Sequence, residues 1–343
     1  RDLHSLRRRQ RQMCIRDSIT TIARSDTAIK ISYSSNIRIL NSYLYDCRVA
    51  ISIISSNDTS IINIRISNCR YAIHVSQSLG VYLINTRIYD SGFRILDAES
   101  FNSTEAINSL YNDEPLVILD VSTNISLSGG TYGALLVGFS GGTITNVISK
   151  YIYIYRCSNL TLKSITVRSN AIGIHLELSD SIELLDLLLE DLGTALMMNY
   201  SSNVYVYGID LSGCNVGISI YSSSVVTIID TWIYDTIAGI RINGTDVRNI
   251  SILDSNIYGC SYGLYLLNAS SIIVGNSTFS ECSFGIYISP KSPNATISLA
   301  IENNRFVSNT IAIYIGTAGS IIIHNNVIYD NDVGLYVDSS ENT

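Results

Sequence analysis

Apolar and polar residues alternate in a pattern that repeats every 22 residues along most of the chain. The repeat is regular over residues 28–93 and again over 151–238. Further turns begin at the small residues Gly239, Gly263, Gly285, Ala312 and Gly334. We number each turn from this small residue, which is position 1. The turns that begin at 239 and 285 are longer by two and five residues, as expected of surface loops inserted into a repeating scaffold.

Positions 2 and 4 of each turn are apolar and flank a variable residue, as in Ile218, Ser219 and Ile220. Positions 10 and 12 repeat this alternation, and position 17 is apolar in every regular turn. Alternation with a period of two predicts a strand with one face in the core. Three short strands per turn, each stacked on its counterpart at a spacing of about 4.8 Å, predict three parallel sheets around one core. No amphipathic stretch is long enough for a helical solenoid.

This turn pattern resembles the right-handed parallel β-helix repeats (PbH1-type) of the pectate-lyase-like superfamily. More narrowly, it resembles the Ile-, Ser- and Asn-rich β-helix domains of the NosD-like group. The resemblance covers nearly everything from about residue 28 onward and lies in the turn pattern, not in a catalytic motif. We therefore predict an all-β fold, a single-stranded right-handed parallel β-helix with three parallel sheets.

The first 17 residues, RDLHSLRRRQRQMCIRD, contain six arginines and no alternating apolar pattern. We interpret residues 1–17 as a non-native or disordered leader, the alternative being a basic arm for nucleic acid. Residues 18–343 are predicted to form one β-helix, with an irregular, loop-bearing segment at about 94–150. Within it, 97–115 is predicted to be a long, acidic, polar loop, either solvated or used for binding. The pattern stops within a turn at the C-terminus, so both ends look truncated.

Two polar positions fit inside the turn. Position 14 is Asn or Asp in most turns, and these residues tolerate left-handed backbone angles, so a ladder at a strand bend is expected there. Its members are Asn41, Asn63, Asn85, Asp186, Asp230, Asp254, Asn276, Asn303 and Asn325. Position 20 holds Cys47, Cys69, Cys214, Cys260 and Cys282. Thiolate metal sites use closely spaced cysteine pairs such as C-x-x-C, whereas these cysteines are separated by whole turns. Stacked cysteines also have parallel side chains, a geometry that suits a disulfide poorly. We therefore prefer structural thiols over a metal or disulfide site.

Composition narrows the class of protein. Charged residues make up 15% and hydrophobic residues 46% of the chain, and the formal net charge is −7. These values disfavour disorder and a nucleic-acid partner. No apolar run approaches the roughly 20 residues of a membrane-spanning helix. An acidic, Lys-poor chain with many N-x-S/T sequons is typical of an extracellular or cell-surface, secreted protein.

Position 3 faces outward and supplies the candidate substrate-binding residues. Tyr265, Tyr287, Tyr314 and Tyr336 follow one another in consecutive turns, and Arg241 and His175 share their face. Flat aromatic rings with a polar edge suit the apolar faces of sugars. The alternative is that these tyrosines only stabilise one another across neighbouring strands.

The resemblance also implies what an active site would contain, either clustered Asp and Glu for calcium with an Arg base, or paired Asp. The chain has no NTD, Asp-Asp, GHG or DPH motif. We predict no cofactor, with calcium as the weaker alternative, because the acidic row at position 19 is interrupted at Asn68, Gly213 and Gly259. Copper sites need clustered His, Met or Cys, and only Met197 and Met198 with His175 come near one another in the repeat.

The sequence thus predicts an extracellular or cell-surface β-helix module that is structural, carbohydrate-contacting or both, and non-catalytic. The expected partner is a polysaccharide or cell-surface glycan, and the oligomeric state stays open. The alternative is a polysaccharide lyase or glycoside hydrolase of the pectate-lyase-like class with an unrecognised active site. Exposed carboxylates converging on one sheet would favour that alternative.

Deleting Arg1 to Asp17 should leave the melting temperature of the protein unchanged, because this segment has no core pattern. Thermal denaturation of the full and shortened chains tests this. A marked drop in melting temperature on deletion would identify the segment as a stabilising cap.

Overall fold

A computed structural model describes residues 20–119, 125–139, 141–289, 297–316 and 320–338. The predicted leader, 1–17, lies outside these residues. The chain divides into two compact units, residues 1–121 (unit 1) and 122–343 (unit 2). The boundary falls inside the segment 94–150, where the 22-residue register breaks. That residues 18–343 form a single β-helix stays a prediction.

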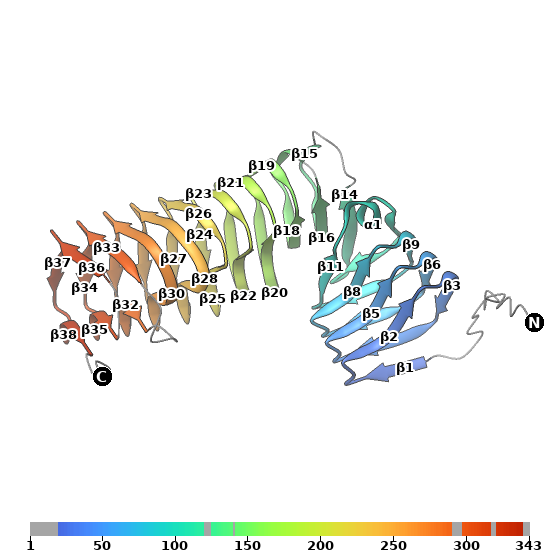
Figure 1. Cartoon of the computed structure of the whole chain (residues 1–343), viewed down its shortest axis with the longest axis horizontal. Coiled ribbons are helices and arrows are strands. Elements are labelled where there is room, and N and C mark those ends of the chain that lie inside the picture. Colours follow the sequence, from blue (N-terminus) through green and yellow to red (C-terminus); the bar gives the residue numbers. More distant parts are fainter. Residues whose placement is uncertain (1–19, 120–124, 140, 290–296, 317–319, 339–343) are drawn as a thin grey trace, which may run out of the picture. The chain divides into compact units, whose positions relative to one another are not determined.

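Unit 1 consists of three parallel sheets, which we call I, II and III after the order of their strands in a turn (Figure 1). Sheet I contains β2 (Thr27–Ser32), β5 (Val49–Ile54), β8 (Tyr71–Ser76) and β11 (Gly92–Ile95). Sheet II contains β3 (Ser35–Leu40), β6 (Asn57–Ile62), β9 (Leu79–Ile84) and β12 (Thr104–Ile107). Sheet III contains β1 (Thr20–Ala23), β4 (Ser42–Tyr45), β7 (Arg65–Ser67), β10 (Arg87–Tyr89) and β13 (Leu110–Tyr111). β14 (Glu114–Leu119) pairs antiparallel with β13.

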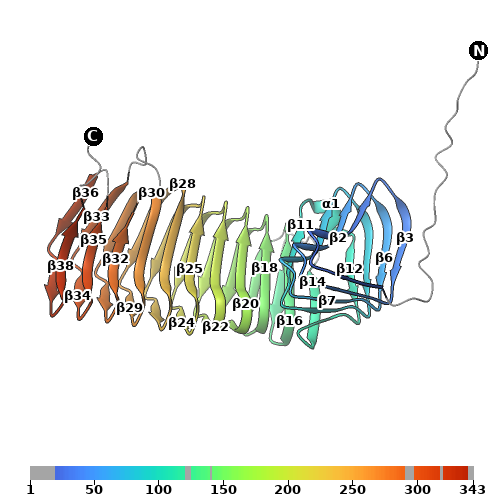
Figure 2. The same ribbon diagram turned by 90° about the horizontal axis from the view of Figure 1, so that it is seen from below.

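Unit 2 repeats the three sheets over more turns, and its strands follow one another in the same order in both views (Figures 1 and 2). Sheet I contains β16 (Thr131–Gly138), β18 (Ile148–Tyr155), β20 (Thr166–Glu177), β22 (Leu188–Asn199), β25 (Val216–Tyr221), β28 (Ala238–Leu253), β30 (Tyr262–Gly275), β32 (Phe284–Ile288), β35 (Ile311–Ile315) and β38 (Val333–Val337). The strands of sheet II alone are β15 (Ile125–Ser128), β17 (Gly142–Thr145), β19 (Ser158–Lys163), β21 (Asp180–Leu185), β23 (Ser202–Tyr207), β26 (Ser224–Ile229), β33 (Ser298–Glu302) and β36 (Ser320–His324). The strands of sheet III alone are β24 (Asp210–Ser212), β27 (Trp232–Tyr234), β29 (Asn256–Tyr258), β31 (Thr278–Ser280), β34 (Arg305–Val307) and β37 (Val327–Tyr329). The strands β16, β18, β20 and β22 continue from sheet III into sheet I, and β28 and β30 continue from sheet I into sheet II. The all-β, parallel solenoid predicted from the repeat is confirmed.

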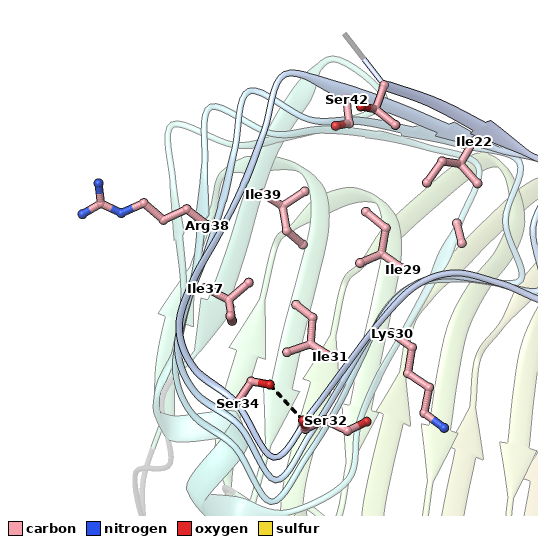
Figure 3. Close-up of a pocket in the computed structure, with 12 residues that line it drawn as sticks. Ile22, Ile29, Lys30, Ile31, Ser32, Ser34, Ile37, Arg38, Ile39 and Ser42 are labelled. Carbon is pink, nitrogen blue, oxygen red and sulfur yellow. Dashed lines mark hydrogen bonds between the residues drawn. The ribbon is translucent and has the colours of Figure 1, made fainter. Parts of the chain in front are cut away.

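The core is the stack of inward residues at positions 2, 4, 10, 12 and 17. They are buried in nearly every described turn, as Ile218, Ile228 and Ile233 show with no exposed surface. The first and last turns differ, since Ile29 is half-buried and Leu335 is 49% exposed. At the N-terminal turn, Ile residues of sheets I and II point into the interior, while Lys30 and Arg38 point away from it (Figure 3). The alternation predicted from the sequence therefore sets which side chains are available to a ligand.

Each turn changes direction at residues with left-handed backbone angles. Every member of the predicted ladder at position 14 has a positive φ, between 48° at Asn41 and 58° at Asn303. The amide of Asn63 donates to Oδ1 of Asn41 in the turn before, at 3.2 Å. Residues at positions 6, 9 and 19, such as Tyr200, Asn203 and Asp191, adopt the same conformation. The ladder is confirmed, and the acidic row at position 19 belongs to these corners.

After the corners at positions 6 and 19, the next residue is typically a buried serine or cysteine that hydrogen-bonds to the backbone. The Cys69 backbone N–H donates to Oγ of Ser91 in the next turn at 3.0 Å, and the Cys47 thiol donates to the carbonyl of Tyr45 at 3.2 Å. Serines at position 7 make the same two bonds, as Ser56 does with Ser78 and Ile54. The six cysteines in the described part of the chain are buried. They occupy a hydrogen-bonding position that Ser and Asn fill in other turns.

The prediction that 97–115 is a long polar loop is wrong. This segment contains a short helix, α1 (Ala98–Asn102), capped by the Asp97 side chain, followed by strands β12 and β13 of unit 1. The signal that was missed is Phe101, which has no exposed surface and fills the interior. Because the residues around Phe101 are polar, the sequence pattern did not reveal that this segment is a further turn of the β-helix with α1 inserted in it.

Ile218→Asp should destabilise the protein by several kcal/mol, because a carboxylate would replace a fully buried side chain without a partner. Ser219→Asp, on the outer face of the same strand, is the matched control and should have little effect. Urea denaturation measures both. Equal stabilities of the two variants would contradict the assignment of inward and outward positions.

Candidate functional site

The outer face of sheet I in unit 2 carries one continuous row of position-3 side chains. In register, Tyr153, His175, Met197, Ser219, Arg241, Tyr265, Tyr287, Tyr314 and Tyr336 lie on adjacent parallel strands. The structure thus brings all six residues predicted from the sequence into one row. The turn that begins at Gly239 accommodates its two extra residues between Asn243 and Arg248, where the register shifts, so the row is not interrupted.

The tyrosines of this row pack against one another. The ring centroids of Tyr287 and Tyr314 are 4.6 Å apart with an interplanar angle of 9°, and those of Tyr314 and Tyr336 are 5.3 Å apart at 8°. Tyr265 is tilted by 52° against Tyr287 at 5.4 Å. Tyr336 is 46% exposed and the other three are half-buried. Because neighbouring rings cover the faces of Tyr314, the inner part of the row presents ring edges and hydroxyl groups rather than ring faces.

A second aromatic pair widens the row on one side. Tyr262 and Phe284 stack at 5.3 Å with an interplanar angle of 7°. Tyr262 also stacks on Tyr265 at 4.9 Å, and Phe284 meets Tyr287 edge-on at 5.0 Å. The sequence analysis missed this pair because it stands just before position 1. The row and this pair together form an aromatic patch over β30, β32, β35 and β38.

Arg241 lies at the inner end of the patch, between Ser219 and Tyr265. Its side chain is half-buried, and it is not in any of the three ion pairs found among the described residues. One strand further, Oδ1 of Asn268 is buried without a hydrogen-bond partner. A guanidinium outside these ion pairs and an unpartnered amide oxygen thus lie on the neighbouring strands β28 and β30.

His175 differs from the expectation that position 3 is exposed. Its side chain is only 5% exposed, its ring lies 5.2 Å from that of Tyr153, and its Nε2 accepts from the Asn199 amide at 2.9 Å. Burial lowers the pKa of His175 to about 4, so the imidazole is neutral at pH 7. The exposure expected at position 3 is also wrong for Tyr153 and Ser52, which are buried.

Tyr153 and Glu177 form a polar contact that the sequence analysis missed. The Tyr153 hydroxyl donates to the Glu177 carboxylate at 2.8 Å, and burial raises the pKa of Tyr153 well above its ordinary value. With His175, this contact brings a phenol, a carboxylate and an imidazole together at one end of the row. Tyr153 has no exposed surface, so the group stabilises the sheet in its present form and is closed to a large substrate.

Sheet II of unit 2 has a shallow polar hollow of about 320 Å³ lined by Asn159, Thr161, Ser181, Ile182, Glu183, Asn203 and Tyr205. Glu183 is exposed and accepts from the Thr161 hydroxyl at 3.0 Å. Hydrogen bonds from Ser202, Ser181 and Asn203 lower the pKa of the adjacent Asp180 carboxyl. The polar groups of this hollow therefore largely satisfy one another.

The fold and the arrangement of these faces define a right-handed parallel β-helix protein, and the model of the right-handed β-helix region matches residues 194–343. The model of the family described as periplasmic copper-binding protein (NosD) matches residues 14–186, half of the chain. The chain belongs to the NosD family. No curated protein sequence matches it significantly.

Solved structures of low sequence identity align with most of the chain. A point mutant of the periplasmic alginate epimerase AlgG aligns with a TM-score of 0.50 and 11% identity over 90% of this chain and 77% of that one. The A-module of mannuronan C-5 epimerase AlgE4 from Azotobacter vinelandii aligns with a TM-score of 0.47 and 11% identity, over 89% of this chain and 88% of that one. The surface adhesin PfbA of Streptococcus pneumoniae aligns with a TM-score of 0.45 and 13% identity, over 94% of this chain and 84% of that one.

The described residues do not fit a copper site, although the family description names this metal. Copper favours clustered imidazole and sulfur ligands. His175 and Met197 are register neighbours, but Nε2 of His175 is occupied by Asn199. No group of three His, Cys, Asp or Glu residues converges anywhere in the part of the chain that the structure describes.

The buried His175 makes stability depend on pH. Its folded pKa of about 4 lies below the ordinary 6.5, so the unfolded chain takes up the proton first and stability falls as the pH drops from 6.5 towards 4. Between pH 7 and pH 5 this should cost about 2 kcal/mol. His175→Gln should remove that loss, whereas the exposed His324→Gln should retain it. Urea denaturation at both pH values tests this, and an equal loss in parent and His175→Gln would contradict a neutral buried imidazole.

Proposed function

We propose that this chain is a β-helix module that works outside the cytoplasm, at or beyond the cell surface. It contacts a polysaccharide along the outer face of sheet I in unit 2 without reacting with it. The observation that carries the proposal is the aromatic row from Tyr265 to Tyr336 with the half-buried Arg241 at its inner end. A ligand that is itself a repeating chain suits such a repeating face.

The stacked geometry favours contact through polar edges. Neighbouring strands of a sheet are about 4.8 Å apart, so the phenol groups of Tyr287 and Tyr314 recur at a regular spacing. The Tyr314 hydroxyl donates to Asp338 at 3.4 Å and keeps its acceptor sites for a ligand. The Arg241 guanidinium adds donors that no described carboxylate occupies. Tyr336, at the end of the stack and 46% exposed, is the ring with most surface to offer a sugar.

Location and partner also draw support from the comparisons. The family is described as periplasmic, and the AlgG structure, which shares the fold, is named for a polysaccharide, alginate. No helix among the described residues has the length and apolar character needed to span a bilayer. An acidic chain with few lysines is consistent with this setting.

A lyase or hydrolase would need exposed carboxylates that converge on one sheet. On the described outer face of sheet I in unit 2, Glu177 lies at one end of the row and Asp338 at the other. Glu177 is engaged by the buried Tyr153. These observations favour binding over catalysis.

Replacing both Tyr287 and Tyr314 by Phe should weaken retention on polysaccharide about 30-fold while leaving stability nearly unchanged, since each lost hydrogen bond is worth about 1 kcal/mol. The double Tyr→Ala variant removes the rings as well and should weaken retention at least as much. Affinity electrophoresis and pull-down against a panel of soluble and insoluble polysaccharides measure this.

Thr227→Ala, on the outer face of sheet II, is the control and should behave as the parent. Failure of the parent to be retained on any polysaccharide would overturn the proposal and leave the chain as a scaffold. Equal retention of parent and Phe variant would exclude contact through the hydroxyl edges.

A further inference from the structure

The outer face of sheet I in unit 1 carries a row of basic and donor groups that the proposed function does not use. Lys30, Ser52, His74 and Arg94 occupy position 3 of consecutive turns and are register neighbours on β2, β5, β8 and β11. Lys30 is exposed and points away from the interior (Figure 3). The row therefore combines an ammonium, a hydroxyl, an imidazole and a guanidinium within one sheet.

Two nitrogen atoms of this row are buried and have no hydrogen-bond partner. They are Nε2 of His74 and Nε of Arg94, on side chains that are otherwise half-buried. Ser52 beside them is only 5% exposed. Unpartnered buried polar groups are rare in native proteins, because each costs the desolvation of a donor or acceptor without return. Their juxtaposition on adjacent strands indicates a site that is completed by a ligand.

No carboxylate of this sheet balances the charge. Strands β2, β5, β8 and β11 contain neither Asp nor Glu. Of the flanking acids, Asp26 forms an ion pair with Arg48. Asp97 accepts from the backbone N–H groups of Gln77 and Ser100. Neither Asp26 nor Asp97 forms an ion pair with Arg94 or His74.

The ring of Tyr71 contacts the guanidinium of Arg94. Cζ of Arg94 lies 5.7 Å from its centroid, in a cation–π contact that leaves the planar donor fork available. Guanidinium forks recognise carboxylate and sulfate groups with two parallel hydrogen bonds. A ligand held this way would bring its second oxygen towards His74 and Ser52.

We propose that an oxyanion, a carboxylate or sulfate group, binds on this face between His74 and Arg94, with Ser52 and Lys30 completing the site. The two sources with this chemistry are a sugar acid and a free inorganic anion. The site lies in unit 1 and uses none of the residues of the aromatic row, so it does not depend on the proposed polysaccharide contact.

Binding should be linked to proton uptake by His74. Burial, and then the charges of Arg94 and Arg48, lower the pKa of His74 in the free protein. The charged or titratable groups on the surrounding strands are Lys30, Tyr71 and Arg94, with Arg48 preceding β5 and Arg70 preceding β8. An oxyanion offsets the effect of Arg94, so the pKa of His74 rises on binding and affinity increases as the pH falls.

The test titrates the full chain with sodium sulfate, sodium galacturonate and glucose at constant ionic strength, followed by calorimetry and by the NMR signals of the His74 ring. We expect saturable binding of at least one anion, no binding of glucose, and an upward shift of the His74 pKa. Saturation by both anions indicates a general oxyanion site, and saturation by galacturonate alone indicates a sugar acid.

Arg94→Gln should weaken anion binding at least about tenfold, as expected for loss of a charge-assisted hydrogen bond. Arg70→Gln is the matched control, because Arg70 also lies over Tyr71, at 5.4 Å, but is exposed and outside the row. Equal anion binding by Arg94→Gln and the parent would overturn the proposal. The proposal would also be overturned if the pKa of His74 in the parent protein stayed the same when each anion was added.

Discussion

The parallel backbone ladder between successive turns is the interaction on which the rest of the structure depends. Bonds such as those from Ser202 N–H to the carbonyl of Ser179 (2.9 Å) and from Ser224 N–H to that of Ser201 (3.0 Å) recur at a spacing of 22 residues. No single turn can bury its own apolar side chains, so each is stable only on its neighbours. The two extra residues after Asn243 lie where β28 passes from sheet I to sheet II, so the register with β25 and β26 is kept on either side of them.

The same constraint produces the outer faces. Because the register is kept from Arg241 to Tyr336, side chains at position 3 must stand one above another, and a row of tyrosines must stack. Stacking stabilises the sheet and at the same time directs the hydroxyl groups outward. In unit 1 the same position gathers His74 and Arg94 instead. The scaffold is thus the same in both units, and the residue type at position 3 determines whether the outer face of sheet I is aromatic or basic.

Periodicity alone predicted the fold, the buried positions and the left-handed corners, because each follows from local spacing and residue type. It predicted which residues share a row, but not how exposed they are. The burial of His175 depends on Tyr153 and Asn199 in neighbouring turns, and the ring angles of Tyr287 and Tyr314 depend on how side chains pack. The interior Phe101 was missed since α1 breaks the period, and the unpartnered atoms of His74 and Arg94 can be recognised only from what surrounds them.

Hydroxyl-radical footprinting with and without bound polysaccharide tests the central claim, contact along the aromatic row, most directly. It reports on every exposed tyrosine in one experiment without altering the sequence. The account predicts protection of Tyr265, Tyr287, Tyr314 and Tyr336, and no change at Tyr205 and Tyr207, which are exposed on sheet II. Protection of Tyr205 and Tyr207 with an unchanged row would contradict it.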